Sequence, residues 1–252
     1  MHNFIIRILC CFVPSKKLRH TIRKKYNKSI SGYTVNGTNN KIYVDNKKLK
    51  HSISGVSIFI NGNNNTIHIP KSIYLENLSI RIDANNTNIT ISDTVYKIRN
   101  LHINACCGDN QSVFIGRNFH CFGVNIQLNE EKASVNIGND CLFSNSISIW
   151  PTDGHSILDK KTGKILNHIT QPVSIGDNCW IGEGVRILKN AQIPSNTIIG
   201  GGSVVAKKFD TEYTAIAGNP AQVIKQDVTW SHKNPTSLEK LKKQINKKRQ
   251  KK

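Results

Sequence analysis

The residue best suited to acid–base chemistry in this sequence is His155, within Asp153-Gly154-His155-Ser156-Ile157. Imidazole exchanges protons near neutral pH, so it can act as a general base that takes a proton from an attacking hydroxyl group. His155 stands in a long insertion, residues 150–172, that interrupts a repeat, and loops often carry functional groups. Asp153 or Asp159 could orient the imidazole ring, as carboxylates do in triads. The residues alone also allow an incidental loop histidine.

A six-residue repeat must position this insertion. From residue 173 onward, an aliphatic residue falls at every sixth position, and a small residue follows four positions later. The aliphatic series is Ile175, Ile181, Ile187, Ile193, Ile199 and Val205. In a helix, six steps of about 100° would spread these side chains over all faces. Strands have a period of two, but Gly, Pro or Asn in each hexad ends every strand after a few residues. Short strands that turn a corner at each hexad predict a solenoid.

The repeat extends upstream in a looser form. Hexads are visible at 115–121 and 137–149, and a longer unit rich in Asn and Gly begins at Val35, Ile60 and Ile82. We expect one irregular coil per unit, and we place its continuation at Ile103 and Ile126. Asn and Gly suit the corners of such coils because they tolerate positive φ.

Charge is concentrated at the two ends of the chain. The net charge is +19 over 252 residues, but residues 1–28 carry eight Lys or Arg and no acid, and residues 239–252 carry eight and one acid. A nearly neutral body with basic tails argues against binding to nucleic acid. It favours tails that bind an anionic membrane surface or that only keep the protein soluble. The seven cysteines show no disulfide or metal-ligand spacing, which favours a reducing cytoplasm.

The sequence predicts that the chain has three parts. Residues 1–30 form a basic amphipathic segment, whose apolar start is too short to span a bilayer and is expected to lie on a membrane or pack on protein. Residues 31–225 form the solenoid domain, with the insertion 150–172 as its catalytic loop. Residues 226–252 form a helix and a basic tail, and Thr236 with Glu239 is the candidate capping box of that helix.

Three motifs carry a resemblance to a known family. Asp153-Gly154-His155, Trp180-Ile181-Gly182 and the glycine-rich run from Gly200, followed by Ala217-Gly218-Asn219-Pro220-Ala221, resemble the hexapeptide-repeat acyltransferases, in the branch that O-acetylates galactosides, maltose and capsular sugars. The resemblance implies an all-β, left-handed parallel β-helix with short N- and C-terminal helices. It also implies a homotrimer with sites between subunits, and acetyl-CoA and a sugar as substrates.

The resemblance assigns roles to single residues. His155 is the general base, assisted by Asp153, and Asn125 contacts the acceptor or is only a corner asparagine. Trp180 faces outward by its place in the hexad and lines the acetyl-CoA site or a subunit interface. Gly201 and Ser203 offer backbone N–H groups to the donor, and Lys207 and Lys208 meet its phosphates. His168 is expected to be a structural or loop residue rather than a second base, and Cys121, Cys141 and Cys179 to be core residues rather than nucleophiles.

Other functions fit parts of the pattern. An N-acetyltransferase of an amino sugar would use the same scaffold, and a non-catalytic solenoid would need neither His155 nor Trp180. A zinc hydratase needs three convergent histidines that the sequence lacks, so no metal is expected. We therefore predict an acetyl-CoA-dependent sugar O-acetyltransferase, cytoplasmic or at the inner face of the membrane, that does not bind nucleic acid.

Overall fold

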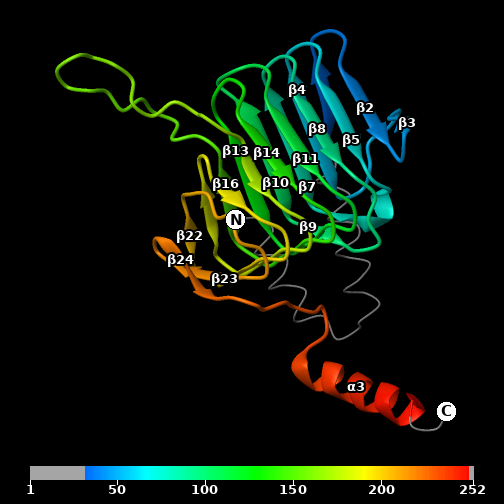
Figure 1. The fold of residues 1–252 in the computed structure, drawn as a ribbon. Helices are drawn as coiled ribbons and strands as arrows, with labels where there is room; N and C mark the ends of the chain where they lie inside the picture. Colours follow the sequence, from blue (N-terminus) through cyan, green and yellow to red (C-terminus); the bar gives the residue numbers. More distant parts are fainter. Residues whose placement is uncertain (1–31, 250–252) are drawn as a thin grey trace, which may run out of the picture.

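The computed structural model describes residues 32–249. The chain winds as a solenoid whose stacked coils form three sheets of eight strands each (Figure 1). Each coil contributes one strand to each sheet in turn, so neighbouring strands are parallel and come from successive coils, except for the antiparallel edge pairs β2–β3 and β23–β24. The expected all-β parallel solenoid is therefore confirmed.

The sheets, named A, B and C, have these members. Sheet A contains β1 (Tyr33–Asn36), β4 (Val56–Asn61), β7 (Leu78–Asp83), β10 (Leu101–Cys106), β13 (Val124–Leu128), β16 (Ile147–Trp150), β19 (Arg186–Leu188) and β22 (Val204–Val205). Sheet B contains β3 (Lys47–Lys48), β2 (Lys41–Val44), β5 (Thr66–Ile69), β8 (Asn88–Ile91), β11 (Ser112–Ile115), β14 (Ser134–Ile137), β17 (Val173–Ile175) and β20 (Gln192–Ile193). Sheet C contains β6 (Leu75–Glu76), β9 (Ile98–Arg99), β12 (His120–Cys121), β15 (Leu142–Phe143), β18 (Trp180–Ile181), β21 (Ile198–Ile199), β23 (Ala215–Gly218) and β24 (Ala221–Lys225).

Aliphatic and small side chains fill the interior of the solenoid. The hexad residues from Ile175 to Val205 are at most 3% exposed, as the repeat predicts. Cys121, Cys141 and Cys179 are fully buried core residues, and burial raises the pKa of the Cys121 thiol to about 12. A thiol in this environment stays protonated at neutral pH, so it is not a nucleophile.

Coil length changes along the solenoid, and this change corrects one register assignment. Ile187 pairs with Val205, three hexads later, whereas Ile82 pairs with Ala105 in a longer coil. We expected Ile103 to continue the series from Ile82, but Ile103 pairs with Ile80. A period of six does not set the register where coils contain extra corner residues.

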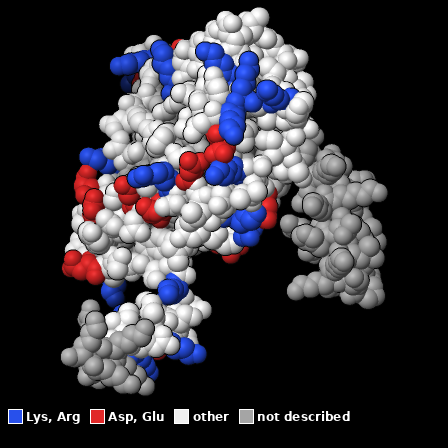
Figure 2. Space-filling model, turned by 90° about the vertical axis from the view of Figure 1, so that its right-hand side faces the viewer, with Lys and Arg blue, Asp and Glu red and all other residues white. Residues whose placement is uncertain are grey.

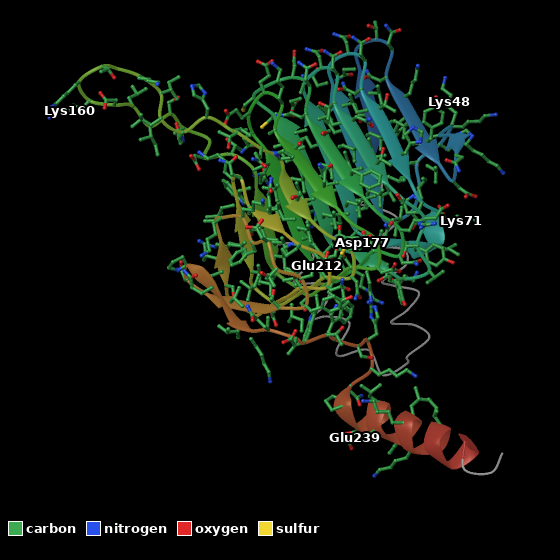
Figure 3. All side chains as sticks on the ribbon, viewed as in Figure 1. Lys48, Lys71, Lys160, Asp177, Glu212 and Glu239 are labelled. Atoms are coloured by element: carbon green, nitrogen blue, oxygen red, sulfur yellow. The ribbon has the colours of Figure 1, made fainter. Side chains whose placement is uncertain are left out.

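Corner asparagines link successive coils, as their tolerance of positive φ suggests. Asn39, Asn64 and Asn86 all have positive φ, and their side chains hydrogen-bond in a ladder, with distances of 3.2 Å and 3.3 Å. Another ladder runs from Asn178 through Asn196 to Glu212, which Figure 3 labels. These ladders give hydrogen-bond partners to polar groups that would otherwise lack them at each corner.

The C-terminal helix α3 spans Pro235–Arg249 and projects away from the solenoid (Figure 1). The proposed capping box at Thr236 is wrong. Asn234 caps the helix, because its side-chain oxygen accepts the Ser237 N–H at 2.9 Å, and Pro235 fits the first helical position. A short 3₁₀ turn, η1 (Ser72–Tyr74), precedes β6.

Charged side chains of both signs lie interspersed on the face of the solenoid that Figure 2 shows. Among residues 32–249, no helix is long and apolar enough to cross a membrane. The predicted N-terminal amphipathic helix falls outside the described residues.

Candidate active site

The insertion that carries His155 joins β16 in sheet A to β17 in sheet B and projects from the solenoid as a long arm (Figure 1). Its two halves pair through an antiparallel bridge between Leu158 and Ile165. Asp159 closes the turn at the tip, where its carboxylate accepts the N–H of Thr162 at 2.7 Å. Figure 3 places the adjacent Lys160 at the far end of the arm. Asp159 therefore shapes the tip and does not orient the His155 ring.

Asn167 anchors the base of the arm. Its side-chain amide donates to the Asp153 carboxylate and to the His155 backbone oxygen, each at 2.8 Å. Its side-chain oxygen accepts the Ile157 N–H at 2.8 Å. One half-buried side chain thereby holds the backbone at His155 and Ile157 and the side chain of Asp153. Sequence reasoning missed Asn167, because an isolated loop asparagine carries no periodic signal.

Lys189 ties this anchor to the solenoid. The ammonium group of Lys189, which follows β19, contacts the Asp153 carboxylate and donates to the Asn167 backbone oxygen at 2.8 Å. Partial burial acts to raise the pKa of the Asp153 carboxyl, but hydrogen bonds from Lys189 and Asn167 and the charge of Lys189 lower it overall. Asp153 was expected to orient the His155 ring. Its hydrogen bonds run to Lys189 and Asn167, so its contact with His155 is indirect and passes through the backbone.

A pocket of about 340 Å³ opens beside the exposed His155 ring, at the corner where sheets A and B meet. Its other lining residues come from the arm and from two preceding corners: Cys107, Asn129, Glu130, Gly154, Ser156, Ile165, Asn167 and His168. Thr152, at the start of the arm, donates to the Glu130 carboxylate at 2.6 Å and so joins the arm to the coil beneath it. His168, which we expected to be a structural or loop residue, lies in the part of the arm that forms the pocket wall. Among residues 32–249, no group of three or more His, Cys, Asp or Glu could hold a metal ion.

Asn125 lies outside the residues that line this pocket. It occupies the outer face of β13, next to Ser148 of β16, and its side-chain oxygen accepts the Gln127 amide at 2.7 Å. The pocket is reached from the opposite end of β13, near Asn129 and Glu130. Within one chain, Asn125 and His155 are therefore not brought together.

Trp180 faces outward from β18 in sheet C and is 39% exposed, as its place in the hexad predicts. In a prism of three sheets, sheet C lies opposite the corner between sheets A and B. Trp180 and His155 thus sit on opposite sides of one chain. The indole ring of Trp230, from the C-terminal segment, lies 6.3 Å from that of Trp180.

The glycine-rich end of the solenoid holds the other expected donor-binding residues. Gly201 is exposed beside Glu183, whereas the Ser203 side chain is buried and donates to the Gly200 oxygen at 2.6 Å. Ser203 is 1% exposed and its backbone oxygen accepts the Arg186 N–H at 2.9 Å, so a ligand could reach no more than its backbone N–H. Lys207 and Lys208 are exposed, and they contact Gln222 and Asp210.

Comparisons with known proteins agree with this fold. Residues 172–207 match the family of the bacterial transferase hexapeptide (six repeats). The polysialic acid O-acetyltransferase of Neisseria meningitidis is 30% identical over 201 residues, which cover 80% of this chain and 90% of that protein. The galactoside O-acetyltransferase of Escherichia coli strain K12 is 32% identical over 117 residues, covering 46% of this chain and 54% of that protein.

Two solved structures share the architecture. The crystal structure of the polySia specific acetyltransferase NeuO superposes with a TM-score of 0.67 at 26% identity, covering 81% of this chain and 91% of that chain. The polysialic acid O-acetyltransferase OatWY gives a TM-score of 0.53 at 25% identity, over 80% and 92%. The solenoid is thus the left-handed β-helix of acyltransferases. This chain belongs to the hexapeptide-repeat O-acetyltransferase family.

Proposed function

We propose that this enzyme transfers the acetyl group of acetyl-CoA to a hydroxyl group of a sugar in a surface glycan, with His155 as general base. The observation that carries the proposal is the placement of His155. The ring lines a polar pocket at the base of an arm, where Asn167 bonds the backbone at His155 and Ile157 and the side chain of Asp153. Preorganised placement of a base next to the acceptor is what such a transfer requires.

The reaction needs no covalent enzyme intermediate. The imidazole of His155 takes the proton of the acceptor hydroxyl group while the acceptor oxygen attacks the thioester carbonyl carbon. The tetrahedral intermediate then collapses, the C–S bond breaks, and the proton passes from the imidazolium to the departing CoA thiolate. Asp153, Asn167 and Lys189 serve this step by fixing the backbone that presents His155.

The relatives support a capsular sugar as acceptor. The Neisseria meningitidis relative, and a second from Escherichia coli O1:K1 that is 29% identical over 126 residues, are polysialic acid O-acetyltransferases. Polysialic acid is therefore the first acceptor to assay, and a neutral glucan and an amino sugar should be assayed for comparison. An amide product on the amino sugar would favour the N-acetyltransferase alternative.

We further propose a homotrimer that completes the site between subunits. Two features support it: Trp180 and His155 lie on opposite sides of one chain, and the arm exposes four apolar side chains. These are Ile157, Leu158, Ile165 and Leu166, each at least 38% exposed. An exposed apolar patch of this kind normally marks an interaction surface. A neighbouring copy that covers the arm would bring its Trp180 face and its Asn125 face toward His155. Light scattering that reports a monomer in an active preparation would contradict this assembly.

The remaining predicted residues take donor and acceptor roles in this proposal. Trp180, the backbone at Gly201 and Ser203, and the exposed Lys207 and Lys208 form the acetyl-CoA side, where the lysines supply charge for phosphate groups. Asn125 contacts the acceptor across the subunit boundary.

The decisive experiment is the substitution His155→Ala. We expect kcat to fall by roughly 10²–10⁴-fold, with acetyl-CoA affinity nearly unchanged, because the base acts on the acceptor proton in the transition state. CoA thiol release and mass spectrometry of the acetylated acceptor would measure turnover, and calorimetry would measure donor binding. The substitution His168→Ala in the same pocket wall is the matched control, with a smaller expected loss. Near-normal turnover in His155→Ala would remove the assigned base.

We also propose that the enzyme works in the cytoplasm at the inner membrane face, where residues 1–28 bind anionic lipid. Removing them should release the enzyme from anionic vesicles and leave it folded and active, since the hexads lie elsewhere. A truncated protein that no longer trimerises would show instead that this segment is an oligomerisation helix.

A further inference from the structure

A strap formed by residues 226–234 crosses the outer face of sheet C between β24 and α3 (Figure 1). The strap runs back along the solenoid from the last coils toward earlier ones. Its Trp230 lies near β18, and its His232 lies near the start of β9 and β12. It covers the face that carries Trp180.

Trp230 is fixed on the solenoid beside Trp180. Its indole N–H donates to the Asn178 backbone oxygen at 2.8 Å, at the corner that leads into β18. Its ring lies 6.3 Å from the Trp180 ring at an angle of 42°, which is within the range of favourable aromatic pairs. Trp180 nevertheless remains 39% exposed. Trp230 therefore supports one side of the Trp180 ring and leaves the rest of the ring open to a ligand.

A second aromatic contact holds the strap in place. His232 packs edge-on against Trp230, with ring centroids 4.7 Å apart, and stacks on Tyr96 at 5.2 Å. Tyr96 in turn stacks on His120 of β12 at 5.1 Å. The rings form a continuous series from an early coil to Trp180, so the strap position is set at more than one point.

We propose that Trp230 is a positioning residue of the donor site, which holds the Trp180 ring in the orientation that acetyl-CoA requires. The inference rests on the proposed function, because it takes Trp180 to line that site. The strap thereby makes the C-terminal segment part of the catalytic unit, although it lies beyond the hexapeptide repeats.

The test compares full-length Trp230→Ala, Trp230→Phe and Trp180→Ala in steady-state assays with acetyl-CoA and polysialic acid. Loss of an aromatic pair should raise KM for acetyl-CoA about two- to tenfold in Trp230→Ala, with kcat at saturating donor nearly unchanged. Trp230→Phe keeps a ring and should show a smaller rise. Phe114→Ala, which removes an exposed ring from sheet B, is the matched control and should leave KM unchanged.

Circular dichroism of the paired indoles reports the Trp180–Trp230 contact in variants whose unchanged thermal midpoint shows that they are folded. Two indoles at this separation couple, so the coupled signal should vanish in both Trp180→Phe and Trp230→Phe and persist in Trp150→Phe. If Trp230→Ala does not fold, Trp230→Leu, which keeps apolar area without a ring, serves in its place.

Two results would overturn the inference in different ways. If Trp180→Ala raises KM for acetyl-CoA and Trp230→Ala leaves it unchanged or lowers it, Trp230 does not position the ring and the donor site stands. If Trp180→Ala itself leaves KM unchanged, the proposed donor site is misplaced, and the role of Trp230 is lost with it.

Discussion

The substitution Asn167→Ala tests how the arm presents His155. It removes three hydrogen bonds of 2.8 Å, to the Asp153 carboxylate, the His155 backbone oxygen and the Ile157 N–H. A hydrogen bond contributes a net of about 0.5–1.5 kcal/mol, and solvent can replace part of these half-buried contacts. We therefore expect the free energy that holds the base of the arm in this conformation to fall by roughly 1.5–3 kcal/mol.

This local loss should appear in catalysis rather than in global stability. Each 1.4 kcal/mol corresponds to a factor of about ten, so kcat/KM for the acceptor should fall roughly 10- to 100-fold. The thermal midpoint should change little, because the arm lies outside the core that the hexads build. CoA thiol release at varied acceptor concentration measures kcat/KM, and calorimetry measures the thermal midpoint.

Asp159→Ala is the matched control in the same arm. Asp159 also accepts three hydrogen bonds, from the Lys161 N–H and from the Thr162 N–H and hydroxyl, but at the tip. We expect a loss of less than about threefold. The reasoning fails if Asn167→Ala keeps normal kcat/KM, or if Asp159→Ala loses as much activity as Asn167→Ala.

Three further predictions concern the core, the pocket and the strap. Ile187→Ala removes a fully buried side chain and should lower the free energy of unfolding by about 2–5 kcal/mol, as measured with denaturant; a loss below about 1 kcal/mol would contradict close packing of the coils. Cys107 is exposed in the pocket wall, so maleimide should alkylate it before the buried cysteines of the described core, and its alkylation should slow acceptor turnover. A Cys107 that does not react with maleimide would argue against an open pocket. Burial and the charges of His232 and Arg99 lower the pKa of His120, so the stability that neutral His120 contributes is complete above its ordinary value near 6.5 and is lost as the pH falls through the lowered value. A free energy of unfolding, measured with denaturant, that does not fall as the pH is lowered below this ordinary value would contradict it.

Much of the solenoid could be predicted from the sequence because its signal is local. The hexads of Ile175, Ile181 and Ile187 each pair with the hexad one coil later, so periodicity along the chain reports packing across the sheets. The same logic places Trp180 outward and the three core cysteines inward. It failed at Ile103, where extra corner residues shift the register by two.

The insertion and its histidine could be located, but not the residues that hold them. The interruption of the repeat and the Asp153-Gly154-His155 motif single out His155, and it does line a pocket. Asp153 contacts Lys189, which lies 36 residues away, and Asn167 bridges between them. No spacing in the chain reports these contacts, because the arm is irregular and folds back on itself.

The sequence by itself determined the repeat and its inward and outward positions, since each depends on neighbours within one or two hexads. Only the tertiary structure decided that Asp153 contacts Asn167 and Lys189, that Trp180 and His155 face opposite sides of one chain, and that Trp230 reaches back to Trp180. The physical reason is distance along the chain. A coil fixes its own strands, whereas the arm and the strap are positioned by single hydrogen bonds and ring contacts between segments that share no period.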